Sequence, residues 1–414
     1  MKKELLTELN PWWDDKTFRY NVRDRAVYTD NFQMLNKDPQ HSSVDILIGP
    51  RRVGKTSLIR NVINKLLNKG VLGRNILYFT ADNILASEYS LEEIIREFLE
   101  NVSGPGAKQK FILIDEIQGL SGWALTVKYF HDNFNLKFLV TGSSSLILNK
   151  DTSRLTGRYK LFEVLGLSFR EYLDFSGKKL FKTLKKNNQL LEEYMYSGGY
   201  PEYVLTGDSV KLDNAIDATL YRDLLTVYGI RNPKILGSLL DYLADKVTTP
   251  VSPVRIAKDL KITDETARFY LQYLQDVYLI CPVYKYGHSN RITKGSLPKY
   301  YFSDTGILNS RSINKKIGLF AENAVYLNLR RQVSRKEFAD IYYHDNDQEI
   351  DFYLPRDNKF IEVKYKDVLQ EEDLAKYLGH KSLVVFTKDK YQIKHREAYP
   401  EIVFENIAEV LLAP

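Results

Sequence analysis

The eight residues from Gly49 to Thr56 have the types and spacing of a phosphate-binding loop, G-x-x-x-x-G-K-T. Glycines let backbone N–H groups close around phosphate oxygens, and the start of the following helix adds partial positive charge. In such loops the lysine reaches the β- and γ-phosphates, and the threonine hydroxyl is a ligand of Mg²⁺. We therefore predict an ATP and Mg²⁺ site made by Gly49, Pro50, Arg51, Arg52, Val53, Gly54, Lys55, Thr56 and Ser57.

An acidic pair and a run of hydroxyl residues follow two apolar stretches further along the chain. Asp115 ends FILID, where a second Mg²⁺-binding carboxylate is expected, and Glu116 can polarise the attacking water as general base. Thr141, Ser143 and Ser144, at the end of LVTGSSS, are placed to sense the γ-phosphate. Helix capping is the alternative for both groups, because Asp, Ser and Thr are favoured N-cap residues.

A second acidic pattern lies near the C-terminal end, D-x10-E-x-K at Asp351, Glu362 and Lys364. This is the spacing of the PD-(D/E)xK nuclease core, where two carboxylates hold Mg²⁺ and the lysine positions or activates water. Glu322, in a helix expected at 318–331, matches the upstream acidic residue of that core. We predict Mg²⁺ or Mn²⁺ binding here. The alternative is a degenerate nuclease fold kept for binding, with these residues solvated or salt-bridged.

The middle of the chain contains the pattern of a helix-turn-helix. Ser252 and Pro253 are typical of a helix start, and Thr263 can cap a second helix after a turn at 261–262. The stretch ICPVYKY would supply the strand of a wing. DNA phosphates could be met by four cations of this module, while a helical lid or an oligomer contact is the alternative. These cations are Arg255, Lys258, Lys261 and Arg268.

Around these motifs, apolar runs alternate with amphipathic segments. The runs are apolar on both faces, which predicts a parallel sheet covered by helices on both sides. We expect strands at 44–49, 76–80, 110–115, 137–142 and 160–165, and helices from 57 to a cap at Gly70, at 91–102 and at 124–134. Beyond Pro298, strands are expected at 299–304, 340–345, 349–354, 359–365 and 382–387, with helices at 318–331 and 370–379.

The predicted fold class is α/β in three parts. Residues 1–170 form a P-loop AAA-type ATPase domain with a parallel sheet. Residues 171–300 form a helical lid and a winged-helix-like module, with a sharp break between helices at Gly198–Pro201. Residues 301–414 form a second, nuclease-like α/β domain.

Composition limits the class of protein. The 414 residues are 44% hydrophobic, enough for two or three folded domains. No apolar run reaches the roughly 18 residues that cross a bilayer, and the N-terminal residues lack a secretory h-region. Cys281 is the single cysteine, so an intramolecular disulfide is excluded. The formal net charge of +6 permits a polyanionic partner without requiring one. We expect a cytoplasmic protein without a membrane segment.

Several longer stretches resemble a known family. GPRRVGKTSL, FILIDEIQ, LVTGSSS and RLTGRYKLFEVLGLSFREYL are similar to AAA-superfamily ATPases of the AAA_14 type, and NPWW and YFSDTGILN match its other landmarks. The resemblance implies a DUF4143-like C-terminal region, which is itself similar to the nuclease fold. It also makes Arg158 a candidate arginine finger or sensor arginine, with Arg154 as the fallback. A surface salt bridge is the alternative for either arginine.

Together these patterns favour an ATP-hydrolysing AAA-superfamily ATPase that binds or remodels DNA. A homo-oligomer is expected, because a finger arginine acts across a subunit boundary. Two alternatives stay open. One is a nucleotide-gated switch that binds a protein partner, and the other is a metal-dependent nuclease regulated by ATP.

Overall fold

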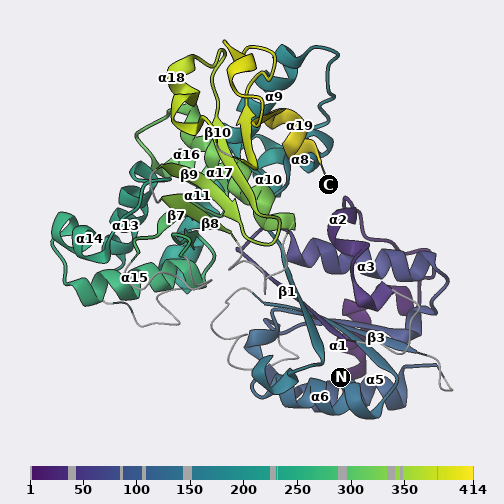
Figure 1. Cartoon of the computed structure of the whole chain (residues 1–414). Coiled ribbons are helices and arrows are strands. Elements are labelled where there is room, and N and C mark those ends of the chain that lie inside the picture. The colour runs from purple at the N-terminus through teal and green to yellow at the C-terminus, as the bar shows by residue number, and fades with distance from the viewer. Residues whose placement is uncertain are drawn as a thin grey trace. The chain divides into compact units, whose positions relative to one another are not determined.

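The chain divides into two compact units, Met1–Val164 and Leu165–Pro414. The first unit ends six residues before the predicted boundary at residue 170. The predicted division of the second unit at residue 300 stays a prediction. The computed structural model (Figure 1) describes residues 2–35, 43–83, 87–104, 109–142, 152–223, 230, 232–287, 296–332, 341–345, 348–379 and 381–413.

The first unit is built on a five-stranded parallel sheet, of which β1 and β3 are labelled in Figure 1. The strand order is β2-β3-β4-β1-β5. Strands β1 to β4 are buried along almost their whole length, as expected for a parallel sheet covered on both faces. The predicted last strand is confirmed, since β5 pairs with β1. The strands are β1 (Val44–Ile48), β2 (Ile76–Thr80), β3 (Lys110–Asp115), β4 (Leu136–Thr141) and β5 (Tyr159–Glu163).

The helices of the first unit follow the predicted pattern with shifts of one or two residues at their ends. Helix α5 begins with a capping box in which Ser90 and Glu93 bond each other's backbone N–H. Gly70, with φ of 81°, follows the end of α3, as the predicted cap required. The helical segments are α1 (Lys2–Leu9), η1 (Pro11–Trp13), α2 (Ala26–Thr29), η2 (Gln33–Leu35), α3 (Lys55–Asn68), η4 (Gly73–Asn75), α5 (Leu91–Asn101), η5 (Ile117–Gly119), α6 (Trp123–Asn133) and η6 (Ser153–Leu155).

The N-terminal segment covers the edge strand β2. The Asn10 side chain donates to the carbonyl of Tyr78 at 2.8 Å and accepts from its N–H at 2.7 Å, as a neighbouring strand would. The Trp13 indole donates to the Ile76 carbonyl at 2.8 Å. Because an open edge exposes backbone groups to other chains, NPWW has a structural purpose here.

The second unit begins with helices that meet at a buried carboxylate. Asp304 accepts hydrogen bonds from the backbone N–H groups of Gly199 and Gly306, each at 2.8 Å, and burial raises its pKa to about 6. A Cβ at Gly198 would collide with this carboxylate, so the predicted break after α9 requires glycine. The first helical segments are α8 (Phe169–Ser176), α9 (Leu184–Ser197), α10 (Pro201–Thr206), α11 (Val210–Asp217) and the π-helical η7 (Ala218–Asp223).

The predicted helix-turn-helix is present. The Ser252 hydroxyl accepts from the N–H of Arg255 at 3.1 Å, and Thr263 accepts from Thr266 at the same distance, so each helix has its predicted cap. A two-stranded antiparallel ribbon follows. The elements are α13 (Pro233–Asp245), α14 (Pro253–Leu260), α15 (Asp264–Asp276), β6 (Ile280–Val283) and β7 (Lys299–Phe302).

A second five-stranded sheet, with the order β12-β11-β10-β9-β8, completes this unit. It is mixed: β10, β11 and β12 run parallel, whereas β8 and β9 are antiparallel to their neighbours. Helix α17 is buried all round from residue 320 to 330 and packs against β10 and α19 (Figure 1). The elements are α16 (Thr305–Arg311), α17 (Ile317–Gln332), β8 (Tyr342–Asp345), β9 (Glu349–Leu354), β10 (Lys359–Lys364), α18 (Glu371–Leu374), η9 (Ala375–Tyr377), β11 (Leu383–Thr387), η10 (Arg396–Ala398), β12 (Val403–Asn406) and α19 (Ile407–Leu412).

Across the described ranges, no helix is both long enough and apolar enough to cross a bilayer. Cys281 is a buried free thiol on β6. The Arg330 guanidinium donates to its sulfur, so the thiol has a polar partner inside the fold.

Candidate functional site

The loop between β1 and α3 has the backbone of a phosphate-binding loop. Gly54 has a φ of 96° and Gly49 a φ of 141°, values that side chains other than glycine rarely allow. A Cβ at Gly49 would also collide with the carbonyl of Val164. Gly54 stands before the first residue of α3 and has no side chain to cap it. The first-turn N–H groups therefore face the loop as donors for an anion.

Lys55 lies with its ammonium group inside this loop. Its Nζ donates to the carbonyl oxygens of Gly49 at 2.9 Å and Pro50 at 2.8 Å, and the residue is 6% exposed. Both acceptors are neutral. Phosphate oxygens can replace these carbonyls, so the lysine is poised for an anionic ligand. Its charge also acts on the buried Asp115 carboxyl, where it opposes the rise in pKa that burial causes.

Thr56, Asp115 and Thr141 join the loop to the carboxyl ends of β3 and β4. The Thr56 hydroxyl donates to Asp115 Oδ2 at 2.6 Å, and the Thr141 hydroxyl donates to Asp115 Oδ1. Burial raises the pKa of the Asp115 carboxyl, and the two hydroxyl donors oppose that rise. A hydroxyl and a carboxylate in contact are the donor set that Mg²⁺ prefers, so these residues fit the ion.

Glu116 is held in an uncommon backbone conformation. Its φ of 53° and ψ of 44° are left-handed, and its N–H donates to the Thr141 hydroxyl at 3.0 Å. The Gln118 amide donates to the Glu116 carboxylate. Glu116 precedes η5 but its side chain makes no cap hydrogen bond to it. The carboxylate is therefore not used as a helix cap, and the conformational strain is typical of functional sites.

Two residues near this loop were missed by sequence reasoning. Arg25, 3% exposed, donates to the Val53 carbonyl at 2.9 Å and so braces the loop from the N-terminal segment. Gln118 orients Glu116. Nothing in the sequence indicates the role of Arg25. Gln118 could have been considered, because it is a polar residue two positions after the predicted base Glu116.

Four predicted residues remain outside a defined nucleotide site. Ser143 and Ser144 lie outside the described residues. Arg158 donates from Nε to both oxygens of Asp132, at 2.8 and 3.0 Å, and lowers the pKa of that carboxyl. Within one chain it thus forms the surface salt bridge that was the alternative. Its action as a finger stays a prediction, as does that of Arg154, which is exposed on η6.

The four predicted DNA-contacting cations are all exposed on α14, α15 and the turn between them. Arg255 pairs with Asp259 at 2.9 Å, and Arg268 pairs with Asp264 at 3.0 Å, each one helical turn away. Phosphate binding by these arginines would compete with the aspartates. Lys258 and Lys261 do not form such a pair with an aspartate of the described part of these helices.

The C-terminal acidic residues come together across β9 and β10. The Val363 N–H donates to Asp351 Oδ2 at 2.8 Å, and the Asp351 N–H donates to Glu362 Oε2 at 3.3 Å. Lys364 pairs with Glu362, as strand alternation predicted. Glu322 faces them from α17 and accepts from the Tyr301 hydroxyl at 2.7 Å.

A lysine that the sequence analysis did not single out lies among these carboxylates. Lys299 Nζ is 3.8 Å from Glu322 Oε1, 3.8 Å from Asp351 Oδ1 and 2.8 Å from Glu349. We call Glu322, Glu349, Asp351 and Glu362 the carboxylate cluster. Burial raises the pKa of Glu322 to about 7 and that of Asp351 well above its ordinary value. Among the described residues, no group of three or more His, Cys, Asp or Glu side chains could hold a metal ion.

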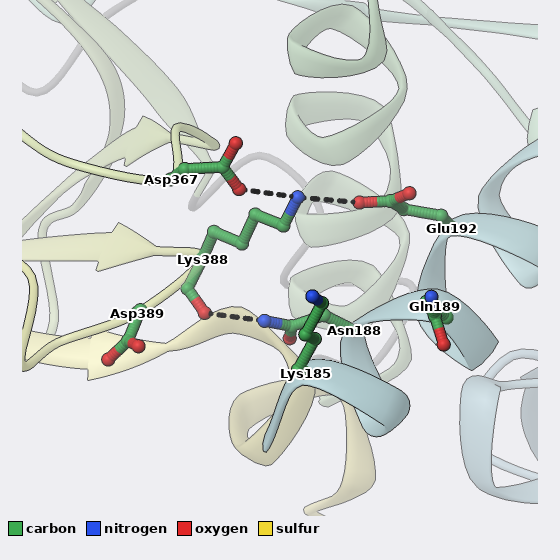
Figure 2. Close-up of a pocket in the computed structure, with 7 residues that line it drawn as sticks. All are labelled: Lys185, Asn188, Gln189, Glu192, Asp367, Lys388 and Asp389. Carbon is green, nitrogen blue, oxygen red and sulfur yellow. Dashed lines mark hydrogen bonds and ion pairs between the residues drawn. The ribbon is translucent and has the colours of Figure 1, made fainter. Parts of the chain in front are cut away.

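A polar cleft of about 320 Å³ lies elsewhere in the second unit, between α9 and the loops after β10 and β11. Figure 2 shows the Lys388 side chain extended between two carboxylates, Asp367 at 2.8 Å and Glu192 at 2.9 Å. The Asn188 amide donates to the Lys388 carbonyl at 3.0 Å. Lys388 thus ties the helix to the loops. The lining residues are Lys185, Asn188, Gln189, Glu192, Asp367, Lys388 and Asp389.

Two family models match the chain. Residues 41–173 match AAA_14, described as an AAA domain, and residues 188–317 match a domain of unknown function, DUF8612. The first match, the fold and the loop geometry support an AAA-superfamily P-loop domain in the first unit. The DUF4143-like and nuclease-like assignment is not confirmed, because the second match is to a different family.

Similar proteins add no function. An uncharacterised protein of Methanocaldococcus jannaschii is 29% identical over 384 residues, covering 87% of this chain and 84% of the relative. An uncharacterised protein of Haemophilus influenzae is 28% identical over 336 residues, covering 78% and 82%. The AMPPCP-bound DnaA structure from Aquifex aeolicus is 16% identical, covers 64% of this chain and 92% of DnaA, and has a TM-score of 0.28. A TM-score this low does not support a conclusion about this chain.

Proposed function

We propose that this protein binds ATP with Mg²⁺ at the loop between β1 and α3 and hydrolyses it. The observation that carries the proposal is the placement of Lys55, Thr56 and Asp115 at the carboxyl edge of one parallel sheet. Donors for phosphate and oxygen ligands for Mg²⁺ thus converge on one edge.

In this proposal each side chain has one role. Lys55 exchanges two loop carbonyls for phosphate oxygens, and the first-turn N–H groups of α3 donate to the same phosphates. Thr56 and Asp115 supply oxygen ligands to Mg²⁺, which when bound neutralises charge on the phosphates. Glu116, oriented by Gln118, orients a water molecule and accepts its proton. Thr141 holds Asp115 and the backbone of Glu116 together.

The experiment is phosphate release from ATP by the full chain, with and without Mg²⁺. Asp115→Asn should reduce release by about 100-fold, since one charged Mg²⁺ ligand is lost. Asp14→Asn, which changes an exposed aspartate of the same unit, is the matched control and should keep the wild-type rate. Equal rates for the two variants would reject the site.

A homo-oligomer with Arg158 acting across the subunit boundary is part of the proposal. Arg158→Ala should lower turnover at saturating ATP by about 100-fold or more and change ATP affinity little, because a finger meets charge that develops in the transition state. Asp132→Ala breaks the same salt bridge and should leave turnover unchanged. The same small loss in both variants would assign Arg158 to the salt bridge alone.

DNA is the second proposed ligand, through a winged-helix-like module made by α14, α15 and the β6–β7 ribbon. Its support is the set of exposed cations on the two helices. Changing Lys258 and Lys261 together to Ala should lower the log–log slope of duplex affinity against salt by about 0.9 per lost contact. Arg255→Ala with Arg268→Ala should change it less, because both arginines have aspartate partners. An unchanged slope in all variants would favour the protein-binding alternative.

A further inference from the structure

The carboxylate cluster contains its own cation. Lys299 is the first residue of β7, is 0% exposed, and has its Nζ within 3.8 Å of oxygens of Glu322 and Asp351. The two oxygens therefore lie no further apart than twice that distance. The Tyr343 ring, 5.3 Å from Nζ, adds a cation–π contact. With Glu349 Oε1 at 2.8 Å, the ammonium group thus faces three carboxylates and an aromatic ring.

The carboxylates also use their remaining lone pairs on protein donors. Asp351 accepts from the Val363 N–H, Glu322 from the Tyr301 hydroxyl, and Glu362 from the Asp351 N–H and Lys364. A buried carboxylate is stable when its oxygens are bonded in this way. The three buried carboxylates of the cluster, Glu322, Asp351 and Glu362, thus each have a hydrogen-bond donor within the protein.

A divalent ion fits this arrangement poorly. Mg²⁺ needs oxygen ligands at about 2.0–2.1 Å in octahedral geometry. A divalent ion bound to these carboxylates would also lie close to the Lys299 ammonium group, and the two positive charges would repel each other strongly. We infer that the Lys299 ammonium is the resident cation of the carboxylate cluster, taking the place that the nuclease resemblance gives to a metal ion. In this inference the second unit retains the arrangement of carboxylates but does not bind a catalytic metal ion there.

The same unit offers a matched comparison. Lys388 also bridges two carboxylates (Figure 2). Its side chain, however, is 24% exposed, against 1% for that of Lys299. Removing Lys388 leaves Asp367 and Glu192 near water, whereas removing Lys299 leaves buried carboxylates without their cation. Only the second change should be costly.

The test is thermal unfolding of the full chain, with Asp115→Asn in every protein so that Mn²⁺ does not bind at the P-loop. Lys299→Met should lower Tm by about 10 °C, and Lys388→Met by about 2 °C. Adding MnCl₂ should leave the protein with Lys299 intact unchanged. Adding Glu322→Gln to Lys299→Met replaces a buried carboxyl group that has lost its cation by a neutral amide, and should recover part of the loss.

Two results would overturn the inference. One is a rise in Tm with MnCl₂ while Lys299 is intact that disappears in Asp351→Asn, because a metal would then be the resident cation. The other is a Lys299→Met protein as stable as Lys388→Met and indifferent to Glu322→Gln. If Lys299→Met does not fold, Lys299→Met with Glu322→Gln should still fold, and failure of that double variant would also count against the inference.

Discussion

The two units each bury a lysine, and the acceptors around it differ. Lys55 donates to two neutral carbonyls of its own loop, whereas Lys299 faces three carboxylates from α17 and β9. A lysine on neutral acceptors keeps its charge for an arriving anion. The charge of a lysine that faces carboxylates is already neutralised within the fold. The comparison teaches that partner charge, more than burial, separates a ligand-binding lysine from a structural one.

The sharpest way to break this comparison is to remove each lysine. Lys55→Ala should reduce ATP turnover by at least about 100-fold and change Tm by only about 2 °C, since its two hydrogen bonds go to neutral carbonyls and the nearby Asp115 carboxylate keeps both of its hydroxyl donors. Lys299→Met should do the reverse, with normal turnover per folded chain and a Tm about 10 °C lower. Turnover assays and thermal unfolding of both variants measure this. A large Tm loss in Lys55→Ala would contradict the distinction.

The brace behind the loop should have the next largest effect. Arg25→Ala frees the Val53 carbonyl and loosens the phosphate-binding backbone, so kcat/KM for ATP should fall by about 10-fold. Arg19→Ala, which removes an exposed arginine of the same segment, is the control for steady-state kinetics. Kinetics equal to those of Arg19→Ala would mean that the loop holds its shape without Arg25.

Gln118 should have the smallest effect of these residues. Gln118→Ala leaves Glu116 in place but removes the amide that orients its carboxylate, so kcat should fall about 3-fold to 10-fold with ATP affinity unchanged. Gln109→Ala, at a partly exposed glutamine just before β3, is the control. A change in ATP affinity without a change in kcat would mean that Gln118 contributes to ATP binding and does not orient Glu116.

The local parts of this structure could be predicted from the sequence. The strand ranges 76–80 and 110–115, the caps at Ser252 and Thr263, and the pairing of Glu362 with Lys364 follow from periodicity and side-chain chemistry within a few residues. The carboxyl edge of the parallel sheet likewise follows from the alternation of strands and helices. These features depend on neighbours along the chain.

What could not be predicted depends on distant partners. Lys299 begins an ordinary Lys-Tyr-Tyr-Phe strand, and nothing there indicates that Asp351, fifty-odd residues later, folds against it. From the sequence, Arg25 would be expected to be a solvated cation; only the fold brings it to the loop carbonyl of Val53. The sequence around Arg158 likewise does not indicate that this arginine forms an ion pair with Asp132 on α6. Charge partners across the fold decide these cases.

The most direct test of ATP hydrolysis at this site is the Glu116→Gln variant. It removes the base but keeps the shape, so ATP should bind with wild-type affinity while phosphate release falls by about 100-fold or more. Glu100→Gln, on an exposed face of α5, is the control and should keep both values. Bound ATP measured by equilibrium dialysis and phosphate release measured on the same samples give both quantities. Wild-type phosphate release by Glu116→Gln would contradict the account.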